Sequence, residues 1–250
     1  VTGFDTLATP EDIPCAASAV EAAIGAEVVI LMLPNGAIVK SVAESIIDGM
    51  AQGSVLVDCS TIDVASARAV AEMAQARGIG AGDAPVSGGI GGAQGGTLTF
   101  MSGGATDDFA RIKPLFDVMG SRAVHCGPSG NGQAAKICNN MILGATMAAT
   151  CEAIALADKL GLGRQEMFDV VSTSSGQSWS MNTYCPALGV GPTSPADNGY
   201  KPGFAAELML KDLRLSQEAA EQVDADTPMG ARATALYAQY VEEEDGKGMD

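Results

Sequence analysis

Residues 130–140 read Gly-Asn-Gly-Gln-Ala-Ala-Lys-Ile-Cys-Asn-Asn, and the pattern of the chain changes at this stretch. Before it, apolar runs of strand length alternate with helical patterns; after it, no strand pattern recurs. Such alternation predicts a doubly wound parallel sheet. The sequence therefore predicts an α/β domain over residues 1–129 and an all-helical domain over residues 130–250, joined by a long helix that starts in this stretch.

Lys136 is the only charged residue between Cys126 and Cys151. A helix over this segment would be apolar nearly all round and so buried by its neighbours. Burial disfavours the ammonium form, and a nearby helix N-terminus acts in the same direction, so both lower the pKa of a lysine. Such a lysine can serve as a general acid and base. The alternative is that Lys136 extends to solvent, as most helical lysines do.

The strand pattern is clearest at Val28–Leu33, a continuous apolar run that suits a parallel strand buried on both faces. Other strands are predicted at 1–5, 55–58, 79–83, 97–101 and 123–126, and helices at 16–23, 37–50, 63–77 and 107–119. Ligands of such sheets bind beyond the carboxyl ends of the strands. The loops expected there are 33–35, 58–62 and 83–89, followed by a glycine-rich segment at 91–96 that predicts a loop.

The second half predicts helices at 164–172, 204–222 and 227–240, with a long loop-rich region at 174–203. Two aromatic residues in that region, Trp179 and Tyr184, either close an apolar pocket or anchor the loop.

Composition excludes several classes of protein. The formal net charge of −16 argues against nucleic-acid binding, which needs lysine and arginine clusters. No continuous apolar run reaches the roughly 18 residues of a membrane helix, so no membrane association is expected. Six scattered cysteines and one histidine predict neither a metal site nor a disulfide framework, and indicate free thiols in a reducing cytosol.

Five stretches, in order, resemble the β-hydroxyacid dehydrogenases, most closely the branch that acts on 3-hydroxyisobutyrate, along essentially the whole chain. These stretches are Leu31–Pro34, Asp58–Asp63, Asp83–Gly89 with Gly96–Met101, Gly130–Asn140 and Lys211–Leu213. The resemblance implies a Rossmann-type domain and NAD-dependent oxidation of a small hydroxy acid, 3-hydroxyisobutyrate, to methylmalonate semialdehyde in valine breakdown.

The resemblance also implies roles for individual residues. Lys136 would be the general acid and base, and Asn140, one helical turn later, would hold the substrate or the lysine in position. Ser87, Gly88 and Gly89 would bind the substrate carboxylate through a hydroxyl and backbone amides. The residues implied to line NAD are Asp5, Leu33, Pro34, Ser60, Thr61 and Lys211.

The chain departs from the family pattern at its start. The family opens with a strand and a GxGxxG turn that binds the pyrophosphate, and neither is present. We therefore expect a fragment that begins inside the second strand and also ends slightly short. Asp5 would then match the acid that binds the adenosine ribose and favours NAD over NADP. We also expect this polypeptide to bind NAD poorly.

The resemblance leaves two other functions open. One is an NAD(P)H-dependent reductase of a small aldehyde acid, such as a tartronate, glyoxylate or succinate semialdehyde reductase; the other is a catalytically dead relative that acts as a binding module. Asn139 stands where relatives acting on 6-phosphogluconate carry a histidine, which disfavours that branch. A homodimer or homotetramer is implied, in a bacterial cytoplasm, with a mitochondrial origin left open.

Overall fold

The computed structural model describes residues 1–9, 12–244 and 246–250. The chain divides into two compact units, Val1–Lys136 and Ile137–Asp250. The division falls within helix α6 (Asn131–Leu160), slightly later than the boundary after residue 129 that the sequence suggests.

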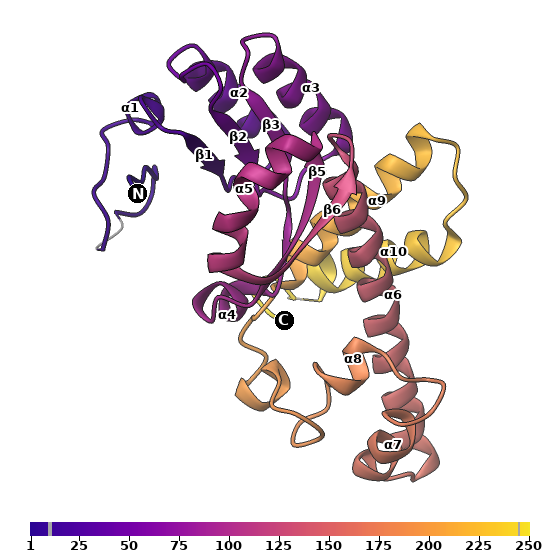
Figure 1. Ribbon diagram of the computed structural model, residues 1–250. Coiled ribbons are helices and arrows are strands. Elements are labelled where there is room, and N and C mark those ends of the chain that lie inside the picture. The colour runs from indigo at the N-terminus through magenta and orange to yellow at the C-terminus, as the bar shows by residue number, and fades with distance from the viewer. Residues whose placement is uncertain (10–11, 245) are drawn as a thin grey trace. The chain divides into compact units, whose positions relative to one another are not determined.

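The first unit contains a six-stranded sheet in the order β1-β2-β3-β5-β4, with β6 paired to β5 (Figure 1). Its strands are β1 (Val28–Leu31), β2 (Val55–Asp58), β3 (Gly80–Asp83), β4 (Val86–Ser87), β5 (Leu98–Gly104) and β6 (Gly120–Gly127). The pairs β1–β2, β2–β3 and β5–β6 are parallel, whereas β5 is antiparallel to β3 and β4. The predicted parallel-dominated sheet is confirmed. It is mixed at β5 because the chain turns back through β4 instead of crossing a sheet face through a helix.

Helices cover both faces of this sheet, as the predicted doubly wound fold requires. Leu56 of β2 belongs to a core cluster with residues of α2 (Gly36–Ile47) and α3 (Val64–Gln75). Its neighbours Val55 and Val57 belong to a second cluster with residues of α5 (Thr106–Met119). Because successive side chains of a strand point to opposite faces, these two clusters lie on opposite sides of the sheet.

Four predicted features near the sheet are wrong in detail. β1 is an edge strand, so Ile30 is 42% exposed instead of buried on both faces. The strand predicted at residues 1–5 is only an isolated bridge between Gly3 and Cys15, and the helix predicted at 16–23 is the shorter α1 (Ala19–Ala23). The glycine-rich segment predicted as a loop contains the short helix α4 (Gly89–Gln94).

The described part of the second unit contains helices and no strand, as predicted. They are the rest of α6, α7 (Arg164–Val171), α8 (Trp179–Asn182), a 3-10 helix η1 (Pro195–Asn198), α9 (Ala206–Gln222) and α10 (Pro228–Glu243). Gly161 ends α6 with a φ of 76°, a conformation that glycine adopts without strain.

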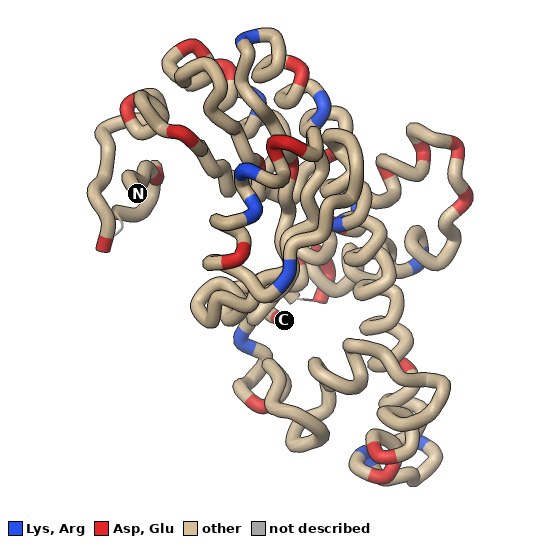
Figure 2. The backbone as a smooth tube through the Cα atoms, viewed as in Figure 1, with Lys and Arg blue, Asp and Glu red and all other residues tan. Residues whose placement is uncertain are grey.

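Helix α6 is nearly uncharged in its middle (Figure 2). Among the described residues it is the one helix long and apolar enough, by length and composition, to cross a membrane. The prediction concerned continuous apolar runs, and α6 contains no such run of this length, because Gln133, Lys136, Asn139 and Asn140 interrupt it; the helix passes on its mean hydropathy. A core helix of a soluble protein passes the same test, so one such helix does not by itself indicate a membrane protein.

Candidate active site

The ends of three parallel strands form one edge of the first unit. Leu31, Asp58 and Asp83, the last residues of β1, β2 and β3, are paired in register. The loops that follow therefore start side by side. The Ser60 hydroxyl accepts a 2.8 Å hydrogen bond from the Leu33 amide, so the structure brings together two residues predicted to line the cofactor.

Asp58 is a buried acid at this edge. One carboxylate oxygen accepts from the Ser60 amide at 3.0 Å, and the other has no hydrogen-bond partner among the described residues. Burial raises the pKa of Asp58 to about 6, and the negative charge of Asp83 adds to the shift. The folded state therefore disfavours the charged form of Asp58.

Asp83 fixes the start of α6. Its two carboxylate oxygens accept from the Gly130 amide at 2.6 Å and from the Gln133 amide at 2.7 Å. The first amides of a helix have no intrahelical acceptor, and a carboxylate is favoured there by the helix dipole. Burial nevertheless raises the pKa of Asp83, while these amides oppose the shift. Gly132 lies between them because a Cβ there would collide with the Met101 carbonyl oxygen.

Gln133 connects α6 to the loop after β2. The side chain is fully buried; its Oε1 accepts from the Ile62 amide at 3.1 Å, and its Nε2 donates to the Ser60 carbonyl at 2.7 Å. Sequence analysis did not single out this residue. A polar side chain in an otherwise apolar stretch was the available signal.

Lys136 lies one helical turn after Gly132 and is 7% exposed. The structure therefore contradicts the alternative in which Lys136 extends to solvent. Its burial places an amine on a helix whose first turn is held by Asp83.

Ser87, Gly88 and Gly89 lie at the junction of β4 and α4, in the same unit as Lys136. Gly88 has a φ of 131° and Gly89 one of 60°, conformations that other residues rarely adopt. A Cβ on Gly88 would also lie 3.2 Å from a methyl group of Leu98. The turn therefore requires glycine, and it presents backbone groups instead of side chains.

The second unit contributes a buried polar cluster. The Asn140 side-chain amide donates to Asp212 at 2.6 Å, and the other oxygen of Asp212 lies 3.3 Å from Lys211 Nζ. Asn140 is 1% exposed and Asp212 2%. The structure thus joins two predicted site residues, Asn140 and Lys211, through an acid whose role the sequence did not predict.

The remaining predicted cofactor residues lie in other settings. Asp5 is exposed, and it accepts hydrogen bonds from the Leu7 and Ala8 amides, which lower the pKa of its carboxyl. Pro34 is exposed and Thr61 half-buried, both in the loops at the strand ends. Asp5 does not lie at the end of a sheet strand, unlike the residues before these loops. Its role stays a prediction.

Trp179 and Tyr184 stack on each other, with ring centroids 4.7 Å apart. The Tyr184 hydroxyl donates to Asp250 at 2.6 Å, and the same carboxylate oxygen accepts from the Gly203 and Phe204 amides. These contacts favour the interpretation in which the two rings anchor the loop.

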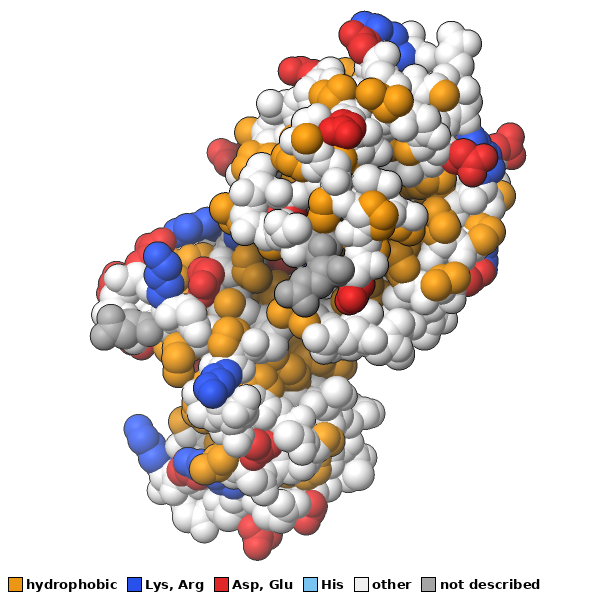
Figure 3. All heavy atoms as spheres, turned by 90° about the vertical axis from the view of Figure 1, so that its left-hand side faces the viewer, with side chains coloured by type: hydrophobic (Ala, Val, Ile, Leu, Met, Phe, Trp, Pro, Cys, Tyr) orange, Lys and Arg blue, Asp and Glu red, His pale blue; other side chains and the backbone are white. Residues whose placement is uncertain are grey.

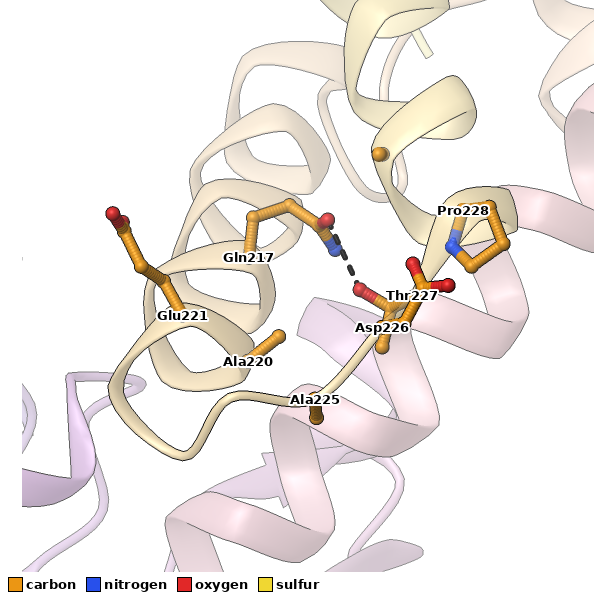
Figure 4. Close-up of a pocket in the computed structure, with 8 residues that line it drawn as sticks. Gln217, Ala220, Glu221, Ala225, Asp226, Thr227 and Pro228 are labelled. Atoms are coloured by element: carbon orange, nitrogen blue, oxygen red, sulfur yellow. Dashed lines mark hydrogen bonds between the residues drawn. The ribbon is translucent and has the colours of Figure 1, made fainter.

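A shallow pocket of about 240 Å³ lies between α9 and α10 in the second unit (Figure 4). Thr227 donates a 3.1 Å hydrogen bond to Gln217 at its wall, and Glu221 and Asp226 make its lining acidic. None of the predicted site residues lines it, so this pocket is separate from the candidate site.

The described ranges contain no group of three or more His, Cys, Asp or Glu residues that could hold a metal ion. On the face shown in Figure 3, Lys and Arg side chains are dispersed among acidic and hydrophobic ones. The absence of nucleic-acid binding stays a prediction.

Comparison with known families matches both halves of the chain. Residues 4–127 match the NAD binding domain of 6-phosphogluconate dehydrogenase. Residues 130–250 match a family described as NAD-binding of NADP-dependent 3-hydroxyisobutyrate dehydrogenase.

Individual relatives cover most of the chain. A 3-hydroxyisobutyrate dehydrogenase of Pseudomonas aeruginosa is 46% identical over 93% of this chain and 80% of its own length. An NAD-dependent L-serine dehydrogenase of the same organism is 44% identical over 89% of this chain and 76% of its own length. The solved Mycobacterium tuberculosis 3-hydroxyisobutyrate dehydrogenase with L-serine is 42% identical, with a TM-score of 0.91 over 95% of this chain and 81% of that one.

Proposed function

We propose that this chain, which belongs to the β-hydroxyacid dehydrogenase family, oxidises 3-hydroxyisobutyrate to methylmalonate semialdehyde. The family makes it an NAD-dependent oxidoreductase. One structural observation supports the chemistry most directly: the only lysine in the first half of α6, Lys136, is buried at a helix start that Asp83 holds in place.

In the proposed reaction, the side-chain amine of Lys136 takes the proton of the 3-hydroxyl. The C3–H bond breaks as the carbonyl forms, so the alcohol loses one proton and one hydride. NAD, when bound, supplies the hydride acceptor. A positioned base of this kind contributes about 10² to 10⁴ in rate.

The first unit offers groups that suit NAD. Dinucleotides bind beyond the carboxyl ends of parallel strands, and the loops that contain Leu33, Pro34, Ser60 and Thr61 start at that edge. We assign these four residues to the cofactor. Asp5 and Lys211 are assigned to it on the family resemblance alone.

The substrate carboxylate is assigned to Ser87, Gly88 and Gly89. The two glycines have positive φ angles, and they carry no side chain that could cover their amides. Asn140 is assigned to the substrate or to Lys136. Its side-chain amide donates to Asp212 and its Oδ1 accepts from Asn139, so both ends of the Asn140 side chain are held in place.

L-Serine is the second candidate substrate. One relative is named an L-serine dehydrogenase, and another was solved with L-serine. Serine carries the same primary hydroxyl and carboxylate, and it differs from 3-hydroxyisobutyrate by an ammonium group in place of a methyl group. Discrimination therefore depends on whether the site around C2 is apolar.

Steady-state kinetics of the protein test the proposal. The substrates are 3-hydroxyisobutyrate, L-serine and, in the reverse direction, tartronate and succinate semialdehydes, each with both nicotinamide cofactors. We expect the highest kcat/KM for 3-hydroxyisobutyrate with NAD, and a loss of about 10² or more in kcat for Lys136→Ala with NAD binding retained. A higher kcat/KM for serine would favour the second candidate, and full activity of Lys136→Ala would exclude the assigned base.

Two further assignments remain. On the family resemblance alone we propose a homodimer or homotetramer, which analytical ultracentrifugation of the protein measures directly. We also propose a cytoplasmic location in a bacterium, because the relatives compared above are bacterial.

A further inference from the structure

Gln133 is a buried polar residue that the proposed reaction does not use. It lies in the first turn of α6, three residues before Lys136. Both ends of its side-chain amide are engaged, one with the Ile62 amide and the other with the Ser60 carbonyl. The side chain thus pairs with the backbone of the loop after β2 on both its donor and its acceptor side.

Gln133 and Ser60 each make a further hydrogen bond, which extends this network. The backbone amide of Gln133 donates to Asp83, and the Ser60 hydroxyl accepts from the Leu33 amide. Ser60 and Gln133 are fully buried, and Asp83 is 3% exposed. A buried network in which these groups are satisfied is rigid, because each broken bond would leave a desolvated polar group unpaired.

We propose that Gln133 is a positioning residue that fixes Lys136 relative to the loop assigned to NAD. This inference rests on the proposed function, because it presumes that Lys136 is the base and that the loop of Ser60 holds NAD. Proton transfer depends on placement: a shift of about 1 Å in a reacting group can cost about 10² in rate. The Gln133 side chain holds the first turn of α6, three residues before Lys136, against the loop of Ser60.

The test variant is Gln133→Met, which keeps the length of the side chain and removes both hydrogen bonds. We expect kcat to fall by about 10- to 100-fold, because a displaced Lys136 is a poorer base. The dissociation constant for NAD should rise several-fold, while KM for the hydroxy acid changes little. The primary deuterium isotope effect on kcat, with substrate deuterated at C3, should increase as bond breaking becomes slower than product release.

The matched control is Asn131→Ala. Asn131 lies in the same helical turn, and its side-chain amide donates to the Cys126 carbonyl at 2.9 Å without reaching the loop of Ser60. Both variants lose side-chain amide hydrogen bonds at the start of α6. The control should lower the urea midpoint of unfolding but leave kcat, the isotope effect and NAD binding unchanged.

A Gln133→Met protein with wild-type kcat and NAD binding overturns the inference, as does an equal loss in Asn131→Ala. If Gln133→Met does not fold, Gln133→Glu decides in the same way, since it keeps an acceptor for Ile62 and removes the donor to Ser60. NAD binding and hydrogen exchange of the Ile62 amide need no turnover. They separate failure of the inference, seen as unchanged exchange in Gln133→Met, from failure of the proposed function, seen as an inactive wild type.

Discussion

At the residue scale, three buried acids differ in the hydrogen-bond donors and cations that lie beside their carboxylates. Asp83 accepts from two backbone amides, and Asp212 lies between the Asn140 amide and the Lys211 amine. Asp58 accepts from the Ser60 amide on one oxygen only, and its other oxygen is buried without a hydrogen-bond partner among the described residues. Asp212 also has one oxygen without a hydrogen bond, but the Lys211 amine lies 3.3 Å from it. Burial raises the pKa of Asp58 to about 6, so its ionisation should destabilise the fold.

This cost predicts a pH dependence of stability. The pKa of Asp58 is raised from 3.8 to about 6, so the folded state holds a proton that the unfolded state has already released. Stability should therefore fall as the pH rises from about 4 to about 6 and then level off, by about 3 kcal/mol from this group alone. Asp58→Asn should remove that fall, so the variant gains stability relative to wild type above pH 6.

Urea unfolding followed by circular dichroism between pH 4 and pH 8 measures the effect. Only the difference between variant and wild type is used, because other groups titrate in the same range. Glu44→Gln, which removes an exposed acid from α2, is the control and should change stability by less than about 0.5 kcal/mol. Parallel pH curves for Asp58→Asn and wild type would show that Asp58 is not the source.

At the element scale, the close approach of α6 and α9 in the second unit depends on Gly144. A Cβ on Gly144 would lie 2.9 Å from a methyl group of Leu213, which is fully buried. Gly144→Ala should thus destabilise the protein by about 1–2 kcal/mol, the overpacking cost less the gain in helix propensity. Because Asn140 and Asp212 lie one turn or less away on the same helices, kcat should fall as well.

A double-mutant cycle with Leu213→Ala checks the cause. If the clash is responsible, Gly144→Ala should cost at least about 0.5 kcal/mol less when Leu213 is already truncated. Equal costs in both backgrounds would locate the destabilisation elsewhere.

At the scale of the whole molecule, the charge is strongly one-sided. The chain carries 30 acidic and 14 basic residues, while the proposed substrate is an anion. Long-range repulsion should lower the encounter of substrate with the enzyme, and salt should relieve it. The screening length falls from about 30 Å at 0.01 M to about 8 Å at 0.15 M ionic strength.

We therefore expect kcat/KM for 3-hydroxyisobutyrate to rise a few-fold over this range of ionic strength. Stopped-flow or steady-state assays with potassium chloride measure it, and sucrose of equal osmolarity serves as the control. A decrease with salt would instead show that cations close to the site dominate the attraction.

Much of the first unit follows from local pattern. Short apolar runs located β1 and β2, and the alternation with helical periods located β3 and the helices between these strands, because such elements form from neighbouring residues. The antiparallel turn of β5 was not predictable in this way. It depends on the pairing of Val86 and Ser87 with Phe100 and Thr99 across a short helix.

The candidate site divides in the same manner. The sequence by itself favoured burial of Lys136, because it is the only charge between Cys126 and Cys151, and it predicted that functional loops follow the strand ends. Only the tertiary structure identified Gln133 and Asp212. Their partners Ser60 and Asn140 lie 73 and 72 residues away in the chain, so the local pattern does not show which groups they bind. A buried hydrogen bond is decided by which distant backbone or side chain the fold brings within about 3 Å, and this information exists only once the chain has packed.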